Sequence, residues 1–342
     1  MAGRRVINLA LQGGGALGAL TWGILDRLLQ EPWLDFEGLS GSSAGAMNAV
    51  ALAAGLAAGG REGARQLLET FWTAVGKASY PVQISYRDEH PGEMMPSASK
   101  FLLGWTRFFS PYQLNPFDIN PLRRIVDELI DFELVRARAP VRLFVGATHV
   151  RSGTLRVFEG RSLTAEHLLA SACLPAISQA VVIDGDAYWD GGYAGNPAIY
   201  PLLYECASAD VLIVLLLPLM RDQAPTSADG IRTRITEIHL NSSFLREMRS
   251  IGLAQRIVGR ASFLRGPLER RLAAARFHMI DTEDLVNRLA VEKSMNTSLQ
   301  FLLRLRDEGR DRAERWLQAE RQAIGRRSSI DIQKLFGDGS PL

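Results

Sequence analysis

The sequence predicts an α/β protein with a largely parallel central sheet. Short apolar runs of strand length alternate with segments of helical spacing between residues 6 and 217, and strands that alternate with helices form parallel sheets. The 342 residues are 47% hydrophobic and 22% charged, which is enough apolar material for a sizeable core. This composition excludes global disorder and collagen-like or low-complexity scaffolds. At about 100–200 residues per domain, the length fits two ordinary domains or one large α/β domain.

The first part of the chain predicts two strand–helix units. Residues 6–11 (VINLAL) form a short apolar run that ends at glycines, and residues 17–30 then place apolar side chains on one helical face. Residues 36–41 are a second strand candidate. The Ala-rich residues 44–60 end in glycines, as a buried helix does, and residues 61–76 follow as an amphipathic helix.

Residues 77–121 differ in composition from the rest of the chain. They hold six prolines and eight aromatic residues, and such a composition interrupts regular structure. We expect an insertion or lid over the main sheet, which would form a mobile cover or an acyl channel beside Ser43. A satellite core beneath a long loop is the alternative.

Regular patterning returns at residue 141. The expected elements are strands at 141–150 and 155–160, a helix at 163–173, a hairpin at 179–192 that turns at Asp184-Gly185, a helix at 194–208 and a buried strand at 211–217. Two long amphipathic helices are then expected over residues 231–276 and 294–325. We therefore predict an α/β domain over residues 1–230 and a helical C-terminal extension over residues 231–342 that packs on it.

Basic charge is concentrated after residue 230. Residues 1–230 carry 18 Lys and Arg against 23 Asp and Glu, whereas residues 231–342 carry 21 against 14. Residues 231–276 hold ten arginines and three glutamates, so we expect this segment to contact an anionic membrane surface or a phosphate-bearing partner. A solvated helix face and a homo-oligomer interface are the alternatives. The overall charge of +2 argues against a dedicated nucleic-acid binder.

Within residues 231–276, apolar side chains are expected to pack on the α/β domain while arginines lie nearer the outside. The expected inward residues are Ile231, Ile235, Ile238, Phe244, Leu245, Met248, Ile251 and Leu253. The expected outward residues are Arg232, Arg234, Arg246, Arg249, Arg256, Arg260 and Arg265.

The sequence gives no sign of a membrane-spanning segment or a disulfide framework. Its apolar runs fall short of the roughly 18–20 residues that cross a bilayer. Cys173 and Cys206 show neither a disulfide pattern nor metal-ligand spacing. A cytoplasmic location is expected, with peripheral membrane attachment if residues 231–276 bind lipid.

Gly41-Ser42-Ser43-Ala44-Gly45 is a G-x-S-x-G sequence between a predicted strand and a predicted apolar helix. That context is typical of a nucleophile elbow, in which a tight turn exposes the serine and small neighbours admit the substrate. The N-terminus of the following helix would favour developing negative charge. Ser43 is therefore a candidate nucleophile, with a chance Gly/Ser turn as the alternative.

A glycine-rich loop, GGGALG at residues 13–18, fits two templates. One is the dinucleotide-binding fingerprint, which needs an acidic residue at the end of the second strand. Asp35 and Glu37 have about the right spacing, but they precede or begin that strand, whose end runs into Ser43. The other template is an oxyanion loop, whose glycine N–H groups face a tetrahedral intermediate. With Ser43 present, the oxyanion loop is favoured.

Asp190-Gly191-Gly192 follows an aromatic strand, and it supplies a candidate base for the serine. The five histidines do not lie in evident glycine-bounded loops, and surface or packing roles suit them better; they are His90, His149, His167, His239 and His278. A carboxylate can serve instead where a dry site raises its pKa. The alternative for Asp190 is a plain turn aspartate, which suits Asp184 and Asp186 better.

The three motifs, GGGALG, GSSAG and DGG in this order, resemble those of the patatin-like phospholipase family. The segments ASACLPAI and GNP strengthen the resemblance, which covers about residues 5–220, and the helices after residue 230 resemble an extension found in one bacterial branch. The resemblance implies a three-layer α/β/α sandwich with additional C-terminal helices. Many members carry Arg or Lys at the position of Leu17, and this departure puts phospholipid specificity in doubt more than hydrolysis.

The resemblance also implies the chemistry. Ser43 is the nucleophile and Asp190 the base, the N–H groups of Gly14 and Gly15 bind the oxyanion, and Gly13 supports the oxyanion hole. We therefore expect a serine hydrolase that cleaves a lipid or other acyl ester through an acyl-enzyme, with no metal and no organic cofactor. A catalytically weak lipid-binding or regulatory protein on the same fold is the first alternative, and a nicotinamide-binding oxidoreductase is the second.

Overall fold

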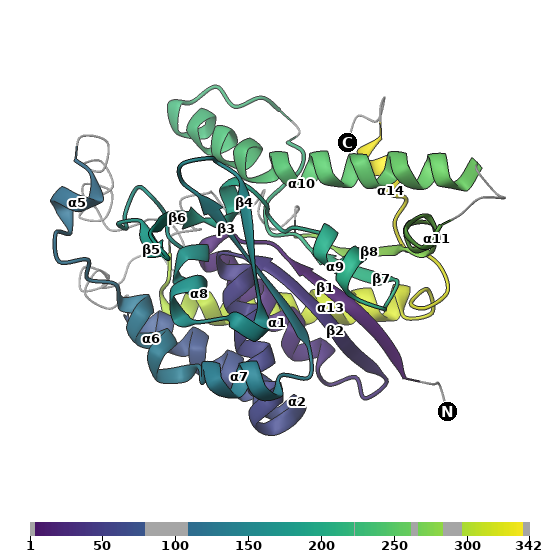
Figure 1. Cartoon of the computed structure of the whole chain (residues 1–342), viewed down its shortest axis with the longest axis horizontal. Coiled ribbons are helices and arrows are strands. Elements are labelled where there is room, and N and C mark those ends of the chain that lie inside the picture. The colour runs from purple at the N-terminus through teal and green to yellow at the C-terminus, as the bar shows by residue number, and fades with distance from the viewer. Residues whose placement is uncertain (1–3, 79–108, 222, 261–265, 283–295, 338–342) are drawn as a thin grey trace.

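A mainly parallel sheet forms the centre of the computed structural model, which describes residues 4–78, 109–221, 223–260, 266–282 and 296–337 (Figure 1). Among these residues, eight strands pair in the order β5-β6-β3-β2-β1-β7-β8, with β4 added beside β3. The strands are β1 (Arg5–Leu11), β2 (Leu34–Ser42), β3 (Arg142–His149), β4 (Leu155–Glu159), β5 (Val181–Ile183), β6 (Asp186–Asp190), β7 (Asp210–Val214) and β8 (Arg276–Ile280). The predicted α/β class is confirmed.

The strands β3, β2, β1, β7 and β8 run parallel, and β4, β5 and β6 add antiparallel pairs at one side. Alternate side chains of the central strands enter two different cores. Leu9 and Leu212 point into one core, whereas Ala10 and Ile213 point into the other. A sheet buried on both faces requires apolar strands throughout, which explains the near-continuous apolar runs in the sequence.

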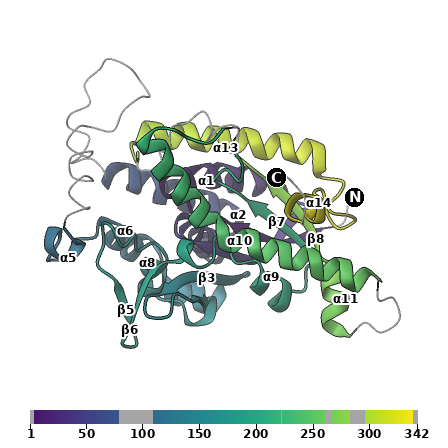
Figure 2. The ribbon, with the colours of Figure 1, turned by 90° about the horizontal axis from the view of Figure 1, so that it is seen from above.

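Helices cover both faces of the sheet, so the molecule has three layers (Figures 1 and 2). One core lies between the sheet and the helices α1 (Gly18–Leu28), α2 (Ala44–Ala78) and α13 (Leu299–Glu320). The other lies beneath α9 (Tyr200–Glu205), α10 (Ala228–Arg260) and α14 (Ile332–Phe336). The remaining helices are α5 (Pro111–Leu114), α6 (Pro121–Leu129), α7 (Phe132–Arg138), α8 (Ala165–Ser171) and α11 (Pro267–Ala274), with short 3-10 turns η1 (Gly15–Leu17), η2 (Gly160–Ser162) and η3 (Gly191–Tyr193).

Two expectations for the helices need correction. The segment 231–276 is not one long helix, because α10 ends at Arg260, α11 follows, and β8 begins at Arg276. β8 pairs in parallel with β7 at the edge of the sheet, so the residues after 230 are not wholly helical. The helix expected over 194–208 is confined to α9, because the preceding residues form a loop at the carboxyl edge of the sheet. The domain boundary at residue 230 stays a prediction.

Other local expectations agree with the structure. The predicted helices at 44–60 and 61–76 meet at Gly59 and Gly60, whose backbone is not helical. Most of the expected lid lies outside the described residues, which resume at residue 109 just before α5. None of the described helices combines the length and apolar character needed to cross a bilayer.

Candidate active site

Three segments that are far apart in the sequence meet at the carboxyl edge of the sheet. The glycine loop follows β1, Ser43 follows β2, and Asp190 ends β6. Parallel strands end at the same edge of a sheet, so the loops that follow β1 and β2 lie together. β3 pairs with β2 on one side and with β6 on the other, and this places Asp190 beside them.

The turn at Ser43 has the geometry of a nucleophile elbow. Its φ is 55°, in the left-handed region that non-glycine residues rarely adopt. A Cβ at Gly41 would lie 2.6 Å from the carbonyl carbon of Gly45, and a Cβ at Gly45 would overlap the carbonyl oxygen of Leu11. Both outer residues of the motif must therefore be glycine for the strand and the helix to pack. Ser171 secures the turn, because its Oγ and its carbonyl each accept from the Ser43 N–H at 3.0 Å.

The glycine loop packs directly against the serine. A Cβ at Gly13 would lie 2.7 Å from the Cβ of Ser43, so a larger residue has no room. The Gly13 N–H donates to Asn196 Oδ1 at 2.7 Å. The N–H groups of Gly14 and Gly15 have no hydrogen-bond partner in the described part of the chain. The structure thus leaves two donors of this loop open, while the donor of Gly13 is occupied.

A buried amide network holds this loop. Gln12 is fully buried, and its Oε1 accepts from the N–H groups of Leu216 and Leu217 at 2.7 and 2.8 Å. Its Nε2 donates to Asn241 Oδ1 at 2.8 Å and to the Asn196 carbonyl at 3.3 Å. Each end of the Gln12 amide is therefore satisfied, and its side chain ties the loop to β7, α10 and the segment after Asp190.

Asp190 is buried next to the serine. Its side chain is 2% exposed, and its Oδ1 accepts from the Gly192 N–H at 2.7 Å. Its Oδ2 has no hydrogen bond of ordinary geometry within the described residues. Burial raises the pKa of Asp190 to about 6, although the nearby Ser43 hydroxyl and the Gly192 N–H lower it. A buried carboxylate with one free oxygen beside a hydroxyl is suited to accept a proton.

The starts of two helices converge on this site. The turn η1 leads straight into α1, and α2 begins immediately after Ser43. A Cβ at Gly18 would lie 2.6 Å from the Cβ of Ala44, so the two N-termini are in contact. Buried Asn48 links them by donating to the Gly18 carbonyl at 2.9 Å. Both helix dipoles present their positive ends here, which favours negative charge on a bound ester oxygen.

The other titratable candidates lie in different surroundings. His167 forms part of the cap of α8, His149 pairs with Asp186, and His278 is fully buried against Asp210. His239 is exposed on α10 and meets Tyr193 edge to face, 5.5 Å between ring centroids. Burial raises the pKa of the Cys173 thiol to about 11, so it does not compete as a nucleophile.

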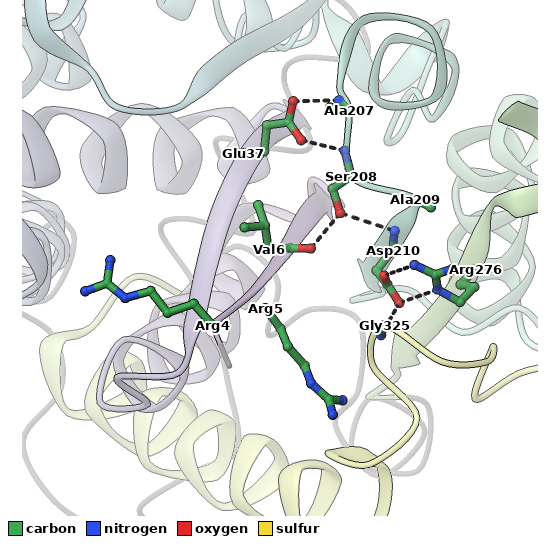
Figure 3. Close-up of a pocket in the computed structure, with 10 residues that line it drawn as sticks. All are labelled: Arg4, Arg5, Val6, Glu37, Ala207, Ser208, Ala209, Asp210, Arg276 and Gly325. Carbon is green, nitrogen blue, oxygen red and sulfur yellow. Dashed lines mark hydrogen bonds and ion pairs between the residues drawn. The ribbon is translucent and has the colours of Figure 1, made fainter. Parts of the chain in front are cut away.

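The acidic residues of the dinucleotide template lie away from the glycine loop. Asp35 is near the amino end of β2, where it pairs with Arg61 at 2.6 Å. Glu37 accepts from the N–H groups of Ala207 and Ser208, both at 2.6 Å (Figure 3). Neither carboxylate can reach a ribose bound at the carboxyl edge. The geometry therefore does not fit the dinucleotide template.

A hollow of about 670 Å³ lies at the opposite edge of the sheet, by the amino ends of β1, β7 and β8 (Figure 3). Its buried carboxylate, Asp210, is fully engaged: Arg276 donates to it at 2.6 and 3.0 Å, His278 at 3.0 Å and the Gly325 N–H at 2.8 Å. These contacts bind β7, β8 and the C-terminal segment together. Among the described residues, no group of three or more His, Cys, Asp and Glu side chains could hold a metal ion.

Sequence reasoning proposed Ser43, Asp190 and the three glycines, which the structure brings together, but it did not single out the residues that hold them. Gln12 and Asn241 carry no local signature, because each acts on a segment that is distant in the sequence. Ser171 lies in the segment ASACLPAI, which strengthens the resemblance without showing what the serine does. For Asn196 the sequence offers one indication, because this residue belongs to the GNP segment that follows DGG.

Known proteins match this chain as follows. A family model described as patatin-like phospholipase matches residues 9–203, which is more than half of the chain. The crystal structure of VipD from Legionella pneumophila is similar over 92% of this chain and 67% of its own, with a TM-score of 0.42 and 14% sequence identity. No curated protein matches. The family match includes all three motifs, at residues 13–18, 41–45 and 190–192.

Proposed function

Since the chain belongs to the patatin-like phospholipase family, which implies lipid acyl hydrolase activity, we propose that it cleaves acyl esters through Ser43 and Asp190. One observation carries the proposal. The Asp190 carboxylate is buried, its Oδ2 has no hydrogen bond of ordinary geometry among the described residues, and the two groups that lower its pKa are the Ser43 hydroxyl and the Gly192 N–H. A structural turn aspartate would have both oxygens in hydrogen bonds or in water.

The reaction proceeds in two halves. Ser43 Oγ attacks the ester carbonyl carbon while Asp190 Oδ2 takes the hydroxyl proton. The oxyanion accepts hydrogen bonds from the N–H groups of Gly14 and Gly15. The tetrahedral intermediate then breaks its bond to the leaving alcohol, whose oxygen takes the proton from Asp190. In the second half, water attacks the acyl-enzyme, gives its proton to Asp190, and releases the fatty acid as Ser43 regains the proton.

The environment of Asp190 supports this role. A general base works best when its pKa lies near the working pH, and burial raises the Asp190 pKa to about 6. Most of the carboxylate is then ionised at neutral pH, yet it is a stronger base than an exposed aspartate. The open N–H groups of Gly14 and Gly15, together with the dipoles of the two helices that start here, supply the complementary stabilisation of negative charge.

A fluorophosphonate probe tests the nucleophile directly. The wild-type protein is expected to become covalently labelled and to hydrolyse a short-chain nitrophenyl ester. Ser43→Ala is expected to abolish both, whereas Ser162→Ala, which changes an exposed serine in η2, leaves both unchanged. Labelling that persists in Ser43→Ala would refute the assignment of Ser43.

The catalytically weak lipid-binding protein remains the second candidate function. It predicts fatty-acid or lipid binding without release of product and without probe labelling. Comparison of the wild type with Ser43→Ala on phospholipid, lysophospholipid, glyceride, polyhydroxyalkanoate and thioester substrates separates the two functions and names the ester. Leu17 is buried and apolar, so it offers a phosphate head group no charge at the position where many members carry a cation.

A further inference from the structure

We propose that the loop of residues 110–120 inserts into an electrically neutral lipid surface and so holds the active site against its substrate. This loop, which includes α5, belongs to the described end of the segment that the sequence predicts as an insertion or lid. The proposal rests on the proposed function only in that a lipid hydrolase must meet its substrate at such a surface.

The first observation is the apolar surface that the 110–120 loop exposes. Phe117 is 86% exposed, Ile119 is 71% exposed and Tyr112 is 57% exposed, and Leu114 adds a further 37%. Asp118 is the only charged residue among these eleven positions of the sequence. Single exposed apolar residues are ordinary, but several gathered in one short loop mark an interaction surface.

The second observation is that the loop satisfies much of its own backbone. The Asn115 side chain closes the turn, because it accepts from the Ile119 N–H at 2.9 Å and donates to the Ile119 carbonyl at 3.0 Å. The N–H groups that donate within the loop are those of Ser110, Gln113, Leu114, Asn115, Asp118 and Ile119. Backbone donors that already have partners lose little when they leave water, and insertion into lipid requires this.

The third observation is that the loop is joined to the segment between α8 and β5. Gln179 Nε2 donates to the Asn115 carbonyl at 2.8 Å, and the Ala180 N–H donates to the Tyr112 hydroxyl at 3.3 Å. This segment and β5 expose apolar side chains of their own, which are Ile177 at 40% and Val182 at 62%. The apolar surface therefore continues from the loop onto its neighbours.

The same segment leads to the candidate base. The Gln179 carbonyl accepts from Cys173 Sγ at 3.0 Å, and the Cys173 carbonyl accepts from the Asp190 N–H at 2.8 Å. α5 lies at the same end of the molecule as β5 and β6, and β6 ends at Asp190 (Figures 1 and 2). A lipid surface that takes up the loop therefore lies beside the edge of the sheet where Ser43 is found.

The size and composition of this surface favour lipid over a second copy of the chain. A stable protein interface uses about 20–30 residues on each side, whereas this surface is one short loop with two neighbouring side chains. Insertion into lipid needs no such area, because each large apolar side chain that leaves water contributes by itself. The family implies lipid acyl hydrolase activity, so lipid is the surface that this protein must meet.

A second exposed apolar stripe lies on α10, and it corrects an expectation from the sequence. Four residues expected to pack inward are instead 43, 60, 53 and 46% exposed; they are Ile231, Ile235, Ile238 and Leu253. Glu237 is buried and binds Arg221 and Arg234, so a polar side of this helix faces the protein and Arg234 does not lie outward as expected. The residues that do pack inward are Phe244, Leu245, Met248 and Ile251. Contact of residues 231–276 with an anionic surface stays a prediction.

Vesicle sedimentation tests the loop in a Ser43→Ala background, in which hydrolysis cannot alter the lipid. The parent is expected to bind phosphatidylcholine vesicles equally at low and high salt, because the contact is apolar. The double variant Phe117→Ser, Ile119→Ser should weaken binding at least tenfold at both salt concentrations. Asp118→Asn should strengthen binding several-fold, because it removes the charge of the loop, and asparagine tolerates the φ of 47° at this position.

A matched control separates the loop from general effects. Tyr204→Ser, Leu268→Ser also removes one exposed aromatic and one exposed aliphatic residue, but from α9 and α11, away from α5 (Figure 1). This control should bind like the parent. A polarity-sensitive dye attached to Phe117→Cys should shift its emission to the blue when vesicles are added, whereas the same dye on Leu268→Cys should not. Cys173 and Cys206 are buried, so the dye reacts at the introduced position.

Hydrolysis assays keep this proposal distinct from the proposed function. In the active background, Phe117→Ser, Ile119→Ser should cleave a soluble short-chain ester at the wild-type rate but vesicle lipid at least tenfold more slowly. Failure of the wild type to cleave the soluble ester would refute the proposed function and leave the vesicle-binding result standing.

Four results would overturn the docking proposal. The first is that the parent does not bind phosphatidylcholine vesicles, or binds only when anionic lipid is added. The second is an equal loss of binding in the loop variant and in the matched control. The third is a fall in Tm of more than about 2 °C in the loop variant, which would assign these side chains to packing within the chain. The fourth is a change of oligomeric state on gel filtration, which would assign the surface to a second copy.

Discussion

Replacement of Asp190 by asparagine should abolish hydrolysis and at the same time stabilise the protein at neutral pH. The folded protein holds this carboxylate in a dry site that raises its pKa to about 6, from an ordinary value of 3.8. Asparagine keeps the acceptor for the Gly192 N–H but carries no charge. The variant therefore removes both the proposed base and the free-energy cost of burying its charge.

The size of the effect follows from the two pKa values. One pKa unit corresponds to about 1.36 kcal/mol, so the ionised carboxylate destabilises the folded protein by about 3 kcal/mol. Below pH 4 the folded and unfolded chains are both protonated at this group, and the cost vanishes. Between about pH 4 and 6 only the unfolded chain loses the proton, so stability falls as pH rises, and above pH 6 the full cost applies.

Urea denaturation followed by circular dichroism measures this directly. Asp190→Asn should raise the free energy of unfolding by about 3 kcal/mol at pH 8 and by little at pH 4. For 342 residues the rise corresponds to about 4 °C in Tm. Asp184→Asn is the matched control: it removes an exposed carboxylate at a turn that asparagine tolerates, and it should change stability by less than about 0.5 kcal/mol.

Two results would refute the reasoning. If Asp190→Asn is no more stable than the wild type at pH 8, the carboxylate is not held in a dry site. If the gain is the same at pH 4 and pH 8, it does not come from ionisation. For the wild type, kcat/KM should rise with pH through about 6 and then level off, as the base loses its proton.

Three further predictions concern the supports of the site. Gly45→Ala should yield little folded protein, because the new methyl group overlaps the Leu11 carbonyl; soluble, active protein would contradict the elbow geometry. Gln12→Leu breaks four buried hydrogen bonds and should cost about 3 kcal/mol in urea denaturation and lower kcat at least tenfold, and unchanged kinetics would show that the loop needs no such anchor. Burial alone would raise the pKa of Asp210. The hydrogen bonds from His278 and Arg276 outweigh this effect and hold the pKa well below its usual range. The stability from this ion pair is therefore fully present at neutral pH, begins to fall below about pH 4, and is lost as pH falls through the folded pKa. Asp210→Asn should cost about 3–5 kcal/mol at pH 7 and progressively less as pH falls below about 4; a cost that does not depend on pH would refute this.

The sequence predicts best the features that depend on neighbouring residues. The turn at Ser43 needs glycine two residues before and two after it, because strand and helix touch there, and this need is visible as GSSAG. Gly13 must be small because it touches Ser43, which again leaves a local signature. The motif around Asp190 also leaves a local signature. Residue 191 must be glycine, because a Cβ there would overlap the Gly146 carbonyl.

Features that depend on distant partners are hidden from the sequence. Gln12 meets Asn241 across 229 positions, and neither residue type announces this contact. β8 reads as part of a helix because its neighbours are rich in Ala and Arg, and it becomes a strand where the free edge of β7 accepts it. The orientation of α10 follows buried polar partners such as Glu237 rather than the apolar periodicity that the sequence displays.

The position of β1 in the middle of the sheet has a consequence for how the chain matures on the ribosome. β1 pairs with β2 soon after synthesis begins, but its other neighbour, β7, is made some 200 residues later. At about 5–20 residues per second, the nascent chain waits about 10–40 s with one edge of β1 unpaired. Late in that interval, once Ser171 has been made, Ser43 can occupy its secured turn, while Gln12 still lacks Leu216 and Asn241. We therefore expect the turn at Ser43 to form before the glycine loop is anchored, and the open edge of β1 to need protection from aggregation until residue 241 has emerged.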